Sequence, residues 1–113
     1  MEAGVDFGWM SLLQRRADYA RKTAASARTP GIAKEFEDLT ALYEKLMEGR
    51  VPAAPAFTSG DPKSGLIRHL QARASQFLMD ARSIADKARA DELRYLAGVF
   101  GAEAARLKND AVR

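Results

Sequence analysis

The sequence predicts an all-α protein in which two tandem antiparallel helical hairpins form a four-helix bundle. Three observations carry this prediction. Apolar residues recur at alternating steps of three and four, prolines and glycines gather in one central stretch, and the segments on either side of that stretch resemble each other. The 113 residues are typical of one domain, so we expect a single helical domain over 1–113, with a hairpin at 8–48, a linker at 49–61 and a hairpin at 62–109.

Start and stop signals divide the chain into elements. Thr29 followed by Pro30 is typical of an N-cap with proline in the first helical turn, Asp61 followed by Pro62 repeats the signal, and Gly49 is typical of a helix end. Between them the stretch GRVPAAPAFTSGDP holds three prolines and two glycines in 14 residues, which neither a helix nor a central strand tolerates. The predicted helices therefore span 8–27, 30–48, 62–85 and 87–109.

The first hairpin has an apolar seam on each helix, with steps of four and three in both. Its second helix carries large residues, which are Ile32, Phe36, Leu39, Tyr43 and Leu46. Its first helix carries mostly small ones, which are Leu13, Ala17, Ala20, Ala24 and Ala27. Folding the chain back at residues 28–31 places large side chains over small ones, from Ala27 near Ile32 to Ala17 near Tyr43.

The second half repeats the first at a spacing of 57 residues without a gap. The two segments share 9 identities over the 31 positions from 13 to 43, which predicts two copies of one hairpin. In the second copy the expected seams are Leu70, Ala74, Phe77, Ala81 and Ile84 against Leu93, Leu96 and Phe100. Glu103 stands where the first copy has Leu46, so we expect either looser packing or a wetter surface at the end of the last helix.

A lone two-helix hairpin buries too little surface to be stable. The two hairpins are therefore expected to pack on each other. The alternative is an open pair of hairpins that completes its core by dimerising.

Composition excludes several classes of protein. The chain has no cysteine, no basic leader ahead of an apolar run and no apolar stretch near the roughly 20 residues that a membrane span needs, so we expect a cytoplasmic protein with no membrane contact. The net charge is +3, with 8 basic and 8 acidic residues in 1–57 and 10 and 7 in 58–113. Acidic and basic residues are interleaved, which favours solvated helix faces over a nucleic-acid surface.

No residue pattern indicates a reaction, so we predict a non-enzymatic protein without cofactor or metal. His69 is the only histidine and has no cysteine to help it bind a metal. Glu35 and Glu92 occupy matching places. They form an acid pair, or oxygen ligands together with Glu44 or Asp91, or, as we favour, first-turn acids that interact with the helix dipole. Ser26 and Ser83 have no base in register.

The last helix contains two glycines, Gly98 and Gly101, each of which costs about 1 kcal/mol relative to alanine. Small residues at these places suit the close approach of another helix. We therefore predict a partner-binding surface at Ala97, Gly98, Gly101 and Ala105, for a protein partner or a second copy of the chain. The alternative function is weak nucleic-acid binding by the arginines of the second hairpin, among them Arg82, Arg89 and Arg94.

Two further features concern aromatic residues. Phe7, Trp9 and Met10 form an apolar cluster that either straps the end of the bundle, as we favour, or docks on a partner. Tyr43 and Tyr95 are candidates for contacts at the rim of an interface.

The stretch RRADYARKTAASARTPGIAKEFEDLTALYEKL resembles the short helical-hairpin proteins of unknown function found in alphaproteobacteria. In those proteins an Arg/Ala-rich helix, a turn with proline and a Leu/Tyr-rich helix follow in order. The resemblance covers residues 13–46 and implies a helical fold and a bacterial origin, but it implies no functional residue.

Overall fold

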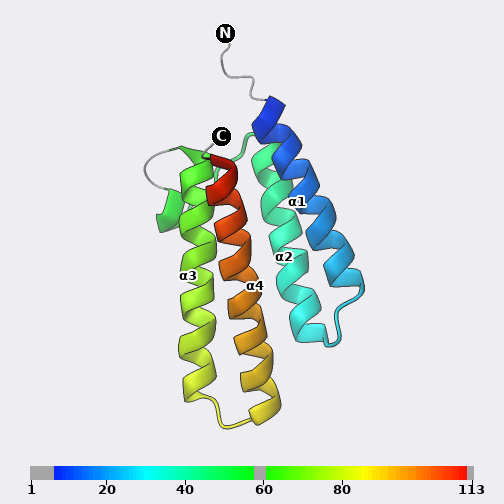
Figure 1. Cartoon of the computed structure of the whole chain (residues 1–113), viewed down its shortest axis with the longest axis vertical. Helices are drawn as coiled ribbons and strands as arrows, with labels where there is room; N and C mark the ends of the chain where they lie inside the picture. Colours follow the sequence, from blue (N-terminus) through cyan, green and yellow to red (C-terminus); the bar gives the residue numbers. More distant parts are fainter. Residues whose placement is uncertain (1–6, 58–60, 112–113) are drawn as a thin grey trace. The chain divides into compact units, whose positions relative to one another are not determined.

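The computed structural model describes residues 7–57 and 61–111, and every regular element in these ranges is a helix. The elements in chain order are α1 (Phe7–Ala25), α2 (Pro30–Met47), the 3₁₀ helix η1 (Pro55–Phe57), α3 (Pro62–Ser83) and α4 (Lys87–Ala111) (Figure 1). Helix α1 packs on α2, and α3 packs on α4. The all-α class and the two tandem antiparallel hairpins of the predicted bundle are confirmed, and all predicted helix ends lie within two residues of the observed ones.

The chain divides into two compact units, with the boundary between Pro52 and Ala53. The first unit contains α1 and α2, and the second contains η1, α3 and α4. The single domain that the sequence predicts stays a prediction.

Side chains cap the helices where the sequence predicts caps. The Thr29 hydroxyl accepts a hydrogen bond from the backbone N–H of Ile32 at 3.2 Å, and the Asp61 carboxylate accepts one from Ser64 at 2.7 Å. This bond to Ser64 is the main reason why the pKa of Asp61 is lowered. Asp86 accepts from the N–H of Ala88 at 3.0 Å at the start of α4. Local chemistry therefore fixes where these helices begin.

Helix α2 ends at Gly49, whose left-handed backbone conformation favours glycine. Gly49 has φ +80°, and its N–H donates to the carbonyl of Leu46 while the N–H of Arg50 donates to Lys45, both at 3.0 Å. This pair of bonds is the Schellman motif, which satisfies carbonyls that the helix end would leave free. The predicted stop at Gly49 is confirmed, with its mechanism.

The core of the first hairpin agrees with the predicted seam on α2, whose members are all buried: Ile32, Phe36, Leu39, Tyr43 and Leu46. On α1 the agreement is partial. Ala17 and Ala20 are fully buried, but Ala24 and Ala27 are half-buried, so the close packing of large on small residues does not reach the turn. Tyr43 has no exposed surface, so the prediction that it lies at the rim of an interface is wrong.

In the second hairpin six of the predicted seam residues are buried: Leu70, Phe77, Ala81, Leu93, Leu96 and Phe100. Ala74, also predicted in this seam, is only half-buried. The rings of Phe77 and Phe100 meet edge to face, with centroids 5.1 Å apart.

Two predictions for this hairpin are wrong. Ile84 is 38% exposed, because α3 ends at Ser83 and Ile84 has extended backbone. Glu103 is only 2% exposed, so the end of α4 is not the wetter surface that its charge suggested.

The 57-residue repeat is visible in the structure of each unit. Helix α2 begins at Pro30 and α4 at Lys87, which is the same register. Arg16 and Arg73 are also equivalent, and each places its guanidinium 4.5 Å from the centroid of an aromatic ring on its own helix, Tyr19 and Phe77 respectively. The two hairpins can therefore be compared position by position.

Within the predicted linker, 49–61, the residues of η1 pack on α3 of the second hairpin. Phe57 in η1 is 9% exposed and lies where a Cβ atom at Gly65 would come within 2.6 Å of its ring, so α3 needs glycine at this place. The Arg68 guanidinium donates two hydrogen bonds to the carbonyl of Ala56, at 2.8 and 3.2 Å. The η1 segment of the linker therefore belongs to the second unit.

Candidate functional site

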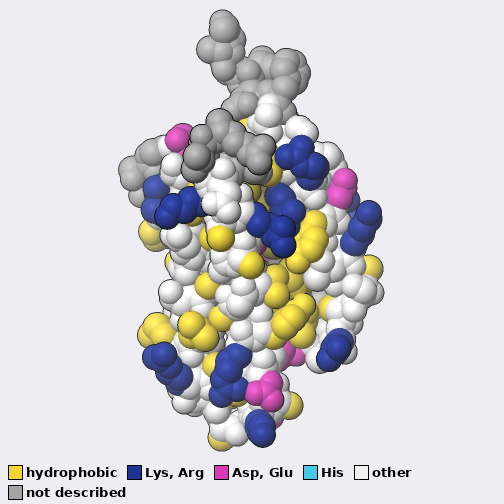
Figure 2. Space-filling model, viewed as in Figure 1, with side chains coloured by type: hydrophobic (Ala, Val, Ile, Leu, Met, Phe, Trp, Pro, Cys, Tyr) yellow, Lys and Arg dark blue, Asp and Glu magenta, His cyan; other side chains and the backbone are white. Residues whose placement is uncertain are grey.

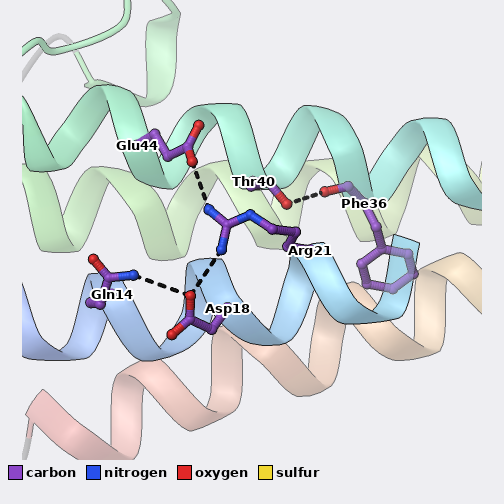
Figure 3. A network of polar contacts seen from close by, with 6 residues as sticks. All are labelled: Gln14, Asp18, Arg21, Phe36, Thr40 and Glu44. Atoms are coloured by element: carbon purple, nitrogen blue, oxygen red, sulfur yellow. Dashed lines mark hydrogen bonds and ion pairs between the residues drawn. The ribbon is translucent and has the colours of Figure 1, made fainter. Parts of the chain in front are cut away.

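The outer surface of the first hairpin carries a polar network that joins α1 to α2 (Figure 3). Arg21 donates to Asp18 at 2.9 Å and to Glu44 on α2 at 2.7 Å, and Gln14 donates to Asp18 at 3.1 Å. These hydrogen bonds raise the pKa of Arg21, the bond to Glu44 more than the bond to Asp18. The Arg21 and Glu44 side chains are both about half exposed, so the ion pair contributes little to stability.

An open groove of about 390 Å³ lies beside this network, between α1 and α2. Its lining residues are Arg21, Ala24, Ala25, Glu37, Thr40, Ala41 and Glu44. Three of these residues are alanines, and three carry charge. The Thr40 hydroxyl donates to the carbonyl of Phe36 at 2.8 Å, so this donor is satisfied within α2 (Figure 3). The groove is therefore lined by both small apolar and charged side chains.

The positions of the second hairpin that are equivalent to this network and groove carry different residues. In the 57-residue register Leu78 stands where the first hairpin has Arg21, and Gly101 stands where it has Glu44. Ala97 and Gly98 correspond to Thr40 and Ala41, and Ala105 corresponds to Glu48. The partner-binding residues predicted from the sequence are thus equivalent to residues in and beside the groove of the first hairpin. The second hairpin has no ion pair at the place of Arg21 and Glu44, because Leu78 and Gly101 stand there.

The structure places the four predicted residues at different depths. Gly98 and Ala105 are exposed and Gly101 is half-buried, and these three share one side of α4 because they lie within about 60° of each other around the helix axis. Ala97 is 6% exposed and belongs to the adjoining buried edge of α4. Gly98, Gly101 and Ala105 therefore form one accessible surface, and Ala97 is buried next to it.

Space around the two glycines is open. A Cβ atom added at Gly98 or at Gly101 would meet no atom within 4 Å, and neither residue has positive φ. Packing within the described structure therefore gives no reason for glycine at either position, in contrast to Gly65.

We expect Gly98→Ala and Gly101→Ala each to raise the free energy of unfolding by up to about 1 kcal/mol, because alanine is the better helix former and meets no neighbour. Urea denaturation followed by circular dichroism measures the change. Gly65→Ala is the matched control, since its Cβ would meet Phe57 and the change should not stabilise. A loss of stability in both Gly98→Ala and Gly101→Ala would show that the open space is filled in solution.

Two exposed apolar residues of α3 were not singled out from the sequence. Leu78 is 44% exposed and Met79 is 59% exposed on α3, and their equivalents in the first hairpin are the charged residues Arg21 and Lys22. Helical periodicity alone gives no reason to notice them. The register of the repeat is the signal that identifies them, since it shows that the hairpin fold accepts charge at both positions.

The structure also places the other residues considered from the sequence. His69 is half-buried, with its ring 5.8 Å from that of Phe57, and burial followed by the charge of Arg73 lowers its pKa. Glu92 forms an ion pair with Arg89. Glu35 and Glu92 each lie beyond the first turn of their helix, so the prediction that they are first-turn acids is wrong. Within 7–57 and 61–111, no three histidine, cysteine or carboxylate side chains are grouped so that they could hold a metal ion.

The two serines have structural roles that match each other. Ser26 donates to the carbonyl of Lys22 at 3.1 Å, and Ser83 donates to that of Met79 at 3.4 Å. These bonds to the preceding turn are common for serine near helix ends.

The arginines expected to bind nucleic acid are partly neutralised. Arg89 pairs with Glu92, and Arg94 pairs with Asp91 at 2.7 Å. Figure 2 shows basic side chains dispersed over each hairpin, with uncharged side chains between them. No single basic stripe is visible on the face drawn.

Of the N-terminal aromatic cluster, Trp9 and Met10 lie in the first turn of α1, where Met10 is 40% exposed. The side chain of Phe7 lies outside the described residues. Neither the strap nor the docking role of this cluster is tested.

Comparison with known proteins gives no match to a family model, to a curated protein or to a solved structure. Among the helices described, none is long and apolar enough to cross a membrane.

Proposed function

We propose that this protein is a non-enzymatic interaction module whose docking surface lies on the second hairpin. The observation that carries the proposal is the difference between the two repeats. Where the first hairpin has Arg21, Lys22 and Glu44, the second exposes Leu78 and Met79 and has Gly101. Because both hairpins fold alike, these uncharged residues are not needed for the fold. Exposed apolar residues that the fold does not require are typical of a binding surface.

The two open glycines support this proposal. Each lowers helix stability, and neither is explained by a neighbour. Close approach of a partner helix to α4 would explain Gly98 and Gly101, because a larger side chain at either position would keep the partner helix at a greater distance. The partner is a protein or a second copy of the chain. We extend the proposal to a cytoplasmic location, which the lack of cysteine supports.

Nucleic-acid binding is the alternative function. It receives less support because Arg89 and Arg94 are paired with acidic residues on their own helix. A nucleic-acid surface needs basic groups that are free to replace the counterions of several phosphates.

In-cell photocrosslinking tests the proposal. A photoreactive amino acid at position 101 should give a protein adduct, and the same amino acid at position 44 is the matched control from the first hairpin. The captured protein is identified by mass spectrometry, purified and titrated against the wild type and Leu78→Arg. We expect binding that is weakened at least about tenfold by the substitution, which corresponds to 1.4 kcal/mol.

Two outcomes would contradict the proposal. One is the absence of any adduct specific to position 101. The other is DNA binding that falls steeply between two salt concentrations and is lost in Arg89→Glu, because that result would assign the second hairpin to nucleic acid.

A further inference from the structure

The 3₁₀ helix η1 is held on α3 by three contacts within the second unit. The Phe57 ring lies against Gly65, where a Cβ atom would come within 2.6 Å of it, and it contacts the His69 ring with centroids 5.8 Å apart. The Arg68 guanidinium donates two hydrogen bonds to the carbonyl of Ala56. Gly65, Arg68 and His69 are spaced at i, i+3 and i+4, so one stripe of α3 receives η1.

The Phe57 ring is the main apolar contact of η1. Within this element Pro55 is exposed and Ala56 is half-buried, whereas Phe57 is buried. Short segments with few buried apolar groups open locally at a much lower free energy than a packed helix pair. We therefore expect η1 to leave α3 without unfolding of the α3–α4 hairpin.

His69 is the titratable group beneath this contact. Histidine is the side chain whose charge ordinarily changes between about pH 5 and 8. Burial, and then the positive charge of Arg73 one turn further along α3, lower the pKa of His69 below its ordinary value of 6.5. Because the Phe57 ring covers part of the imidazole, departure of η1 would return part of His69 to water and make a proton there less costly.

No acidic side chain in the described part of the chain offsets this effect. Helix η1 has no titratable side chain, and Figure 1 shows it on the opposite side of α3 from α4. The charged residues near the end of α4 include Glu103, Arg106 and Lys108. Among the described residues, Arg73 is the charged group that acts on the pKa of His69.

We propose that η1 is a pH-sensitive strap, which binds α3 while His69 is neutral and leaves it when His69 takes up a proton. Because the docked form binds a proton less well, docking has its full strength above about pH 6.5 and weakens as the pH falls below that value. After release, the segment that joins the two units runs from Arg50 to the start of α3, whereas in the docked form it ends at η1.

Nuclear magnetic resonance of the imidazole ring in the full chain without an affinity tag tests the strap, because the chain has no other histidine. We expect a pKa below 6.5 for His69 in the wild type. Phe57→Ala removes the covering ring and Gly65→Ala displaces it, so both should raise this pKa toward 6.5. Arg73→Gln removes only the charge and should raise it by less, because burial is the larger cause.

A fluorine label follows the docking of the ring itself. With 4-fluorophenylalanine at position 57, the fluorine signal should change from that of a buried ring to that of an exposed ring as the pH falls, with the same midpoint as the titration of His69. In His69→Gln the signal should stay constant between about pH 5 and 8, because glutamine takes up no proton. The pKa of Asp61 at the start of α3 is lowered from 3.8, so its titration lies outside this range.

Several results would overturn the proposal. A His69 pKa at or above 6.5 in the wild type would show that the Phe57 ring favours the charged imidazole, as in a cation–π contact. A larger rise in Arg73→Gln than in Phe57→Ala would assign the low pKa to charge instead of to the strap. A fluorine signal that changes with pH equally in the wild type and in His69→Gln would reject His69 as the switch, and this comparison needs no substitution at Phe57 or Gly65 that removes a packing contact.

Discussion

Phe77→Ala is expected to lower the free energy of unfolding by about 3–5 kcal/mol, the largest effect of any substitution considered for this protein. The Phe77 ring is 2% exposed, meets Phe100 edge to face at 5.1 Å and has the Arg73 guanidinium 4.5 Å from its centroid. Truncation removes all of these contacts and leaves a cavity in the core of the second hairpin. Urea denaturation followed by circular dichroism measures the loss.

Tyr95→Ala is the matched control for Phe77→Ala, because Tyr95 is an aromatic residue of the same hairpin that is 50% exposed. It should change stability by much less. Equal losses in the two variants would show that Phe77 is not part of the core in solution.

The same experiment tests the predicted single domain. Trp9 is the only tryptophan and lies in α1, so its fluorescence reports the first hairpin, while circular dichroism reports all helices. If the two hairpins unfold together, Phe77→Ala should shift both transitions equally. A shift in circular dichroism without a shift in Trp9 fluorescence would show that the hairpins are independent domains.

Ala20→Phe is expected to destabilise the first hairpin by about 1–3 kcal/mol, for the opposite reason. Ala20 is equivalent to Phe77 in the repeat, but it is fully buried against a helix whose own seam already holds large residues, among them Phe36 and Leu39. A ring added at Ala20 has no space, so side chains must leave their preferred rotamers or the helices must separate. Trp9 fluorescence in urea follows this hairpin directly.

Ala25→Phe is the control for Ala20→Phe, since Ala25 is exposed at the end of the same helix. It should be nearly neutral. An unchanged transition in Ala20→Phe would mean that the small-residue seam of α1 does not face the large residues of α2.

The sequence by itself determined the helices and their ends, because the signals for them are local. Thr29 and Asp61 cap the N–H groups of residues only three positions away, and the positive φ of Gly49 is a property of its own backbone. The large-residue seam of α2 also follows from sequence, since a strict three-and-four spacing leaves one side of a helix apolar whatever its partner.

Only the tertiary structure decided which charged residues are buried and which apolar residues are exposed. Glu103 is buried although it is charged, and Leu78 is exposed although it is apolar, because exposure depends on how closely the facing helix approaches at each level. The docking of Phe57 beside Gly65 joins residues on two elements, and no periodicity within either one indicates it.

The candidate surface was therefore half predictable. Gly98 and Gly101 could be found from the sequence, since glycine within a helix is unfavourable wherever the helix packs. Leu78 and Met79 could not, because a leucine at helical spacing is equally consistent with a core position. Only packing, which buries one side of α3 and leaves the other in water, identifies them as surface residues.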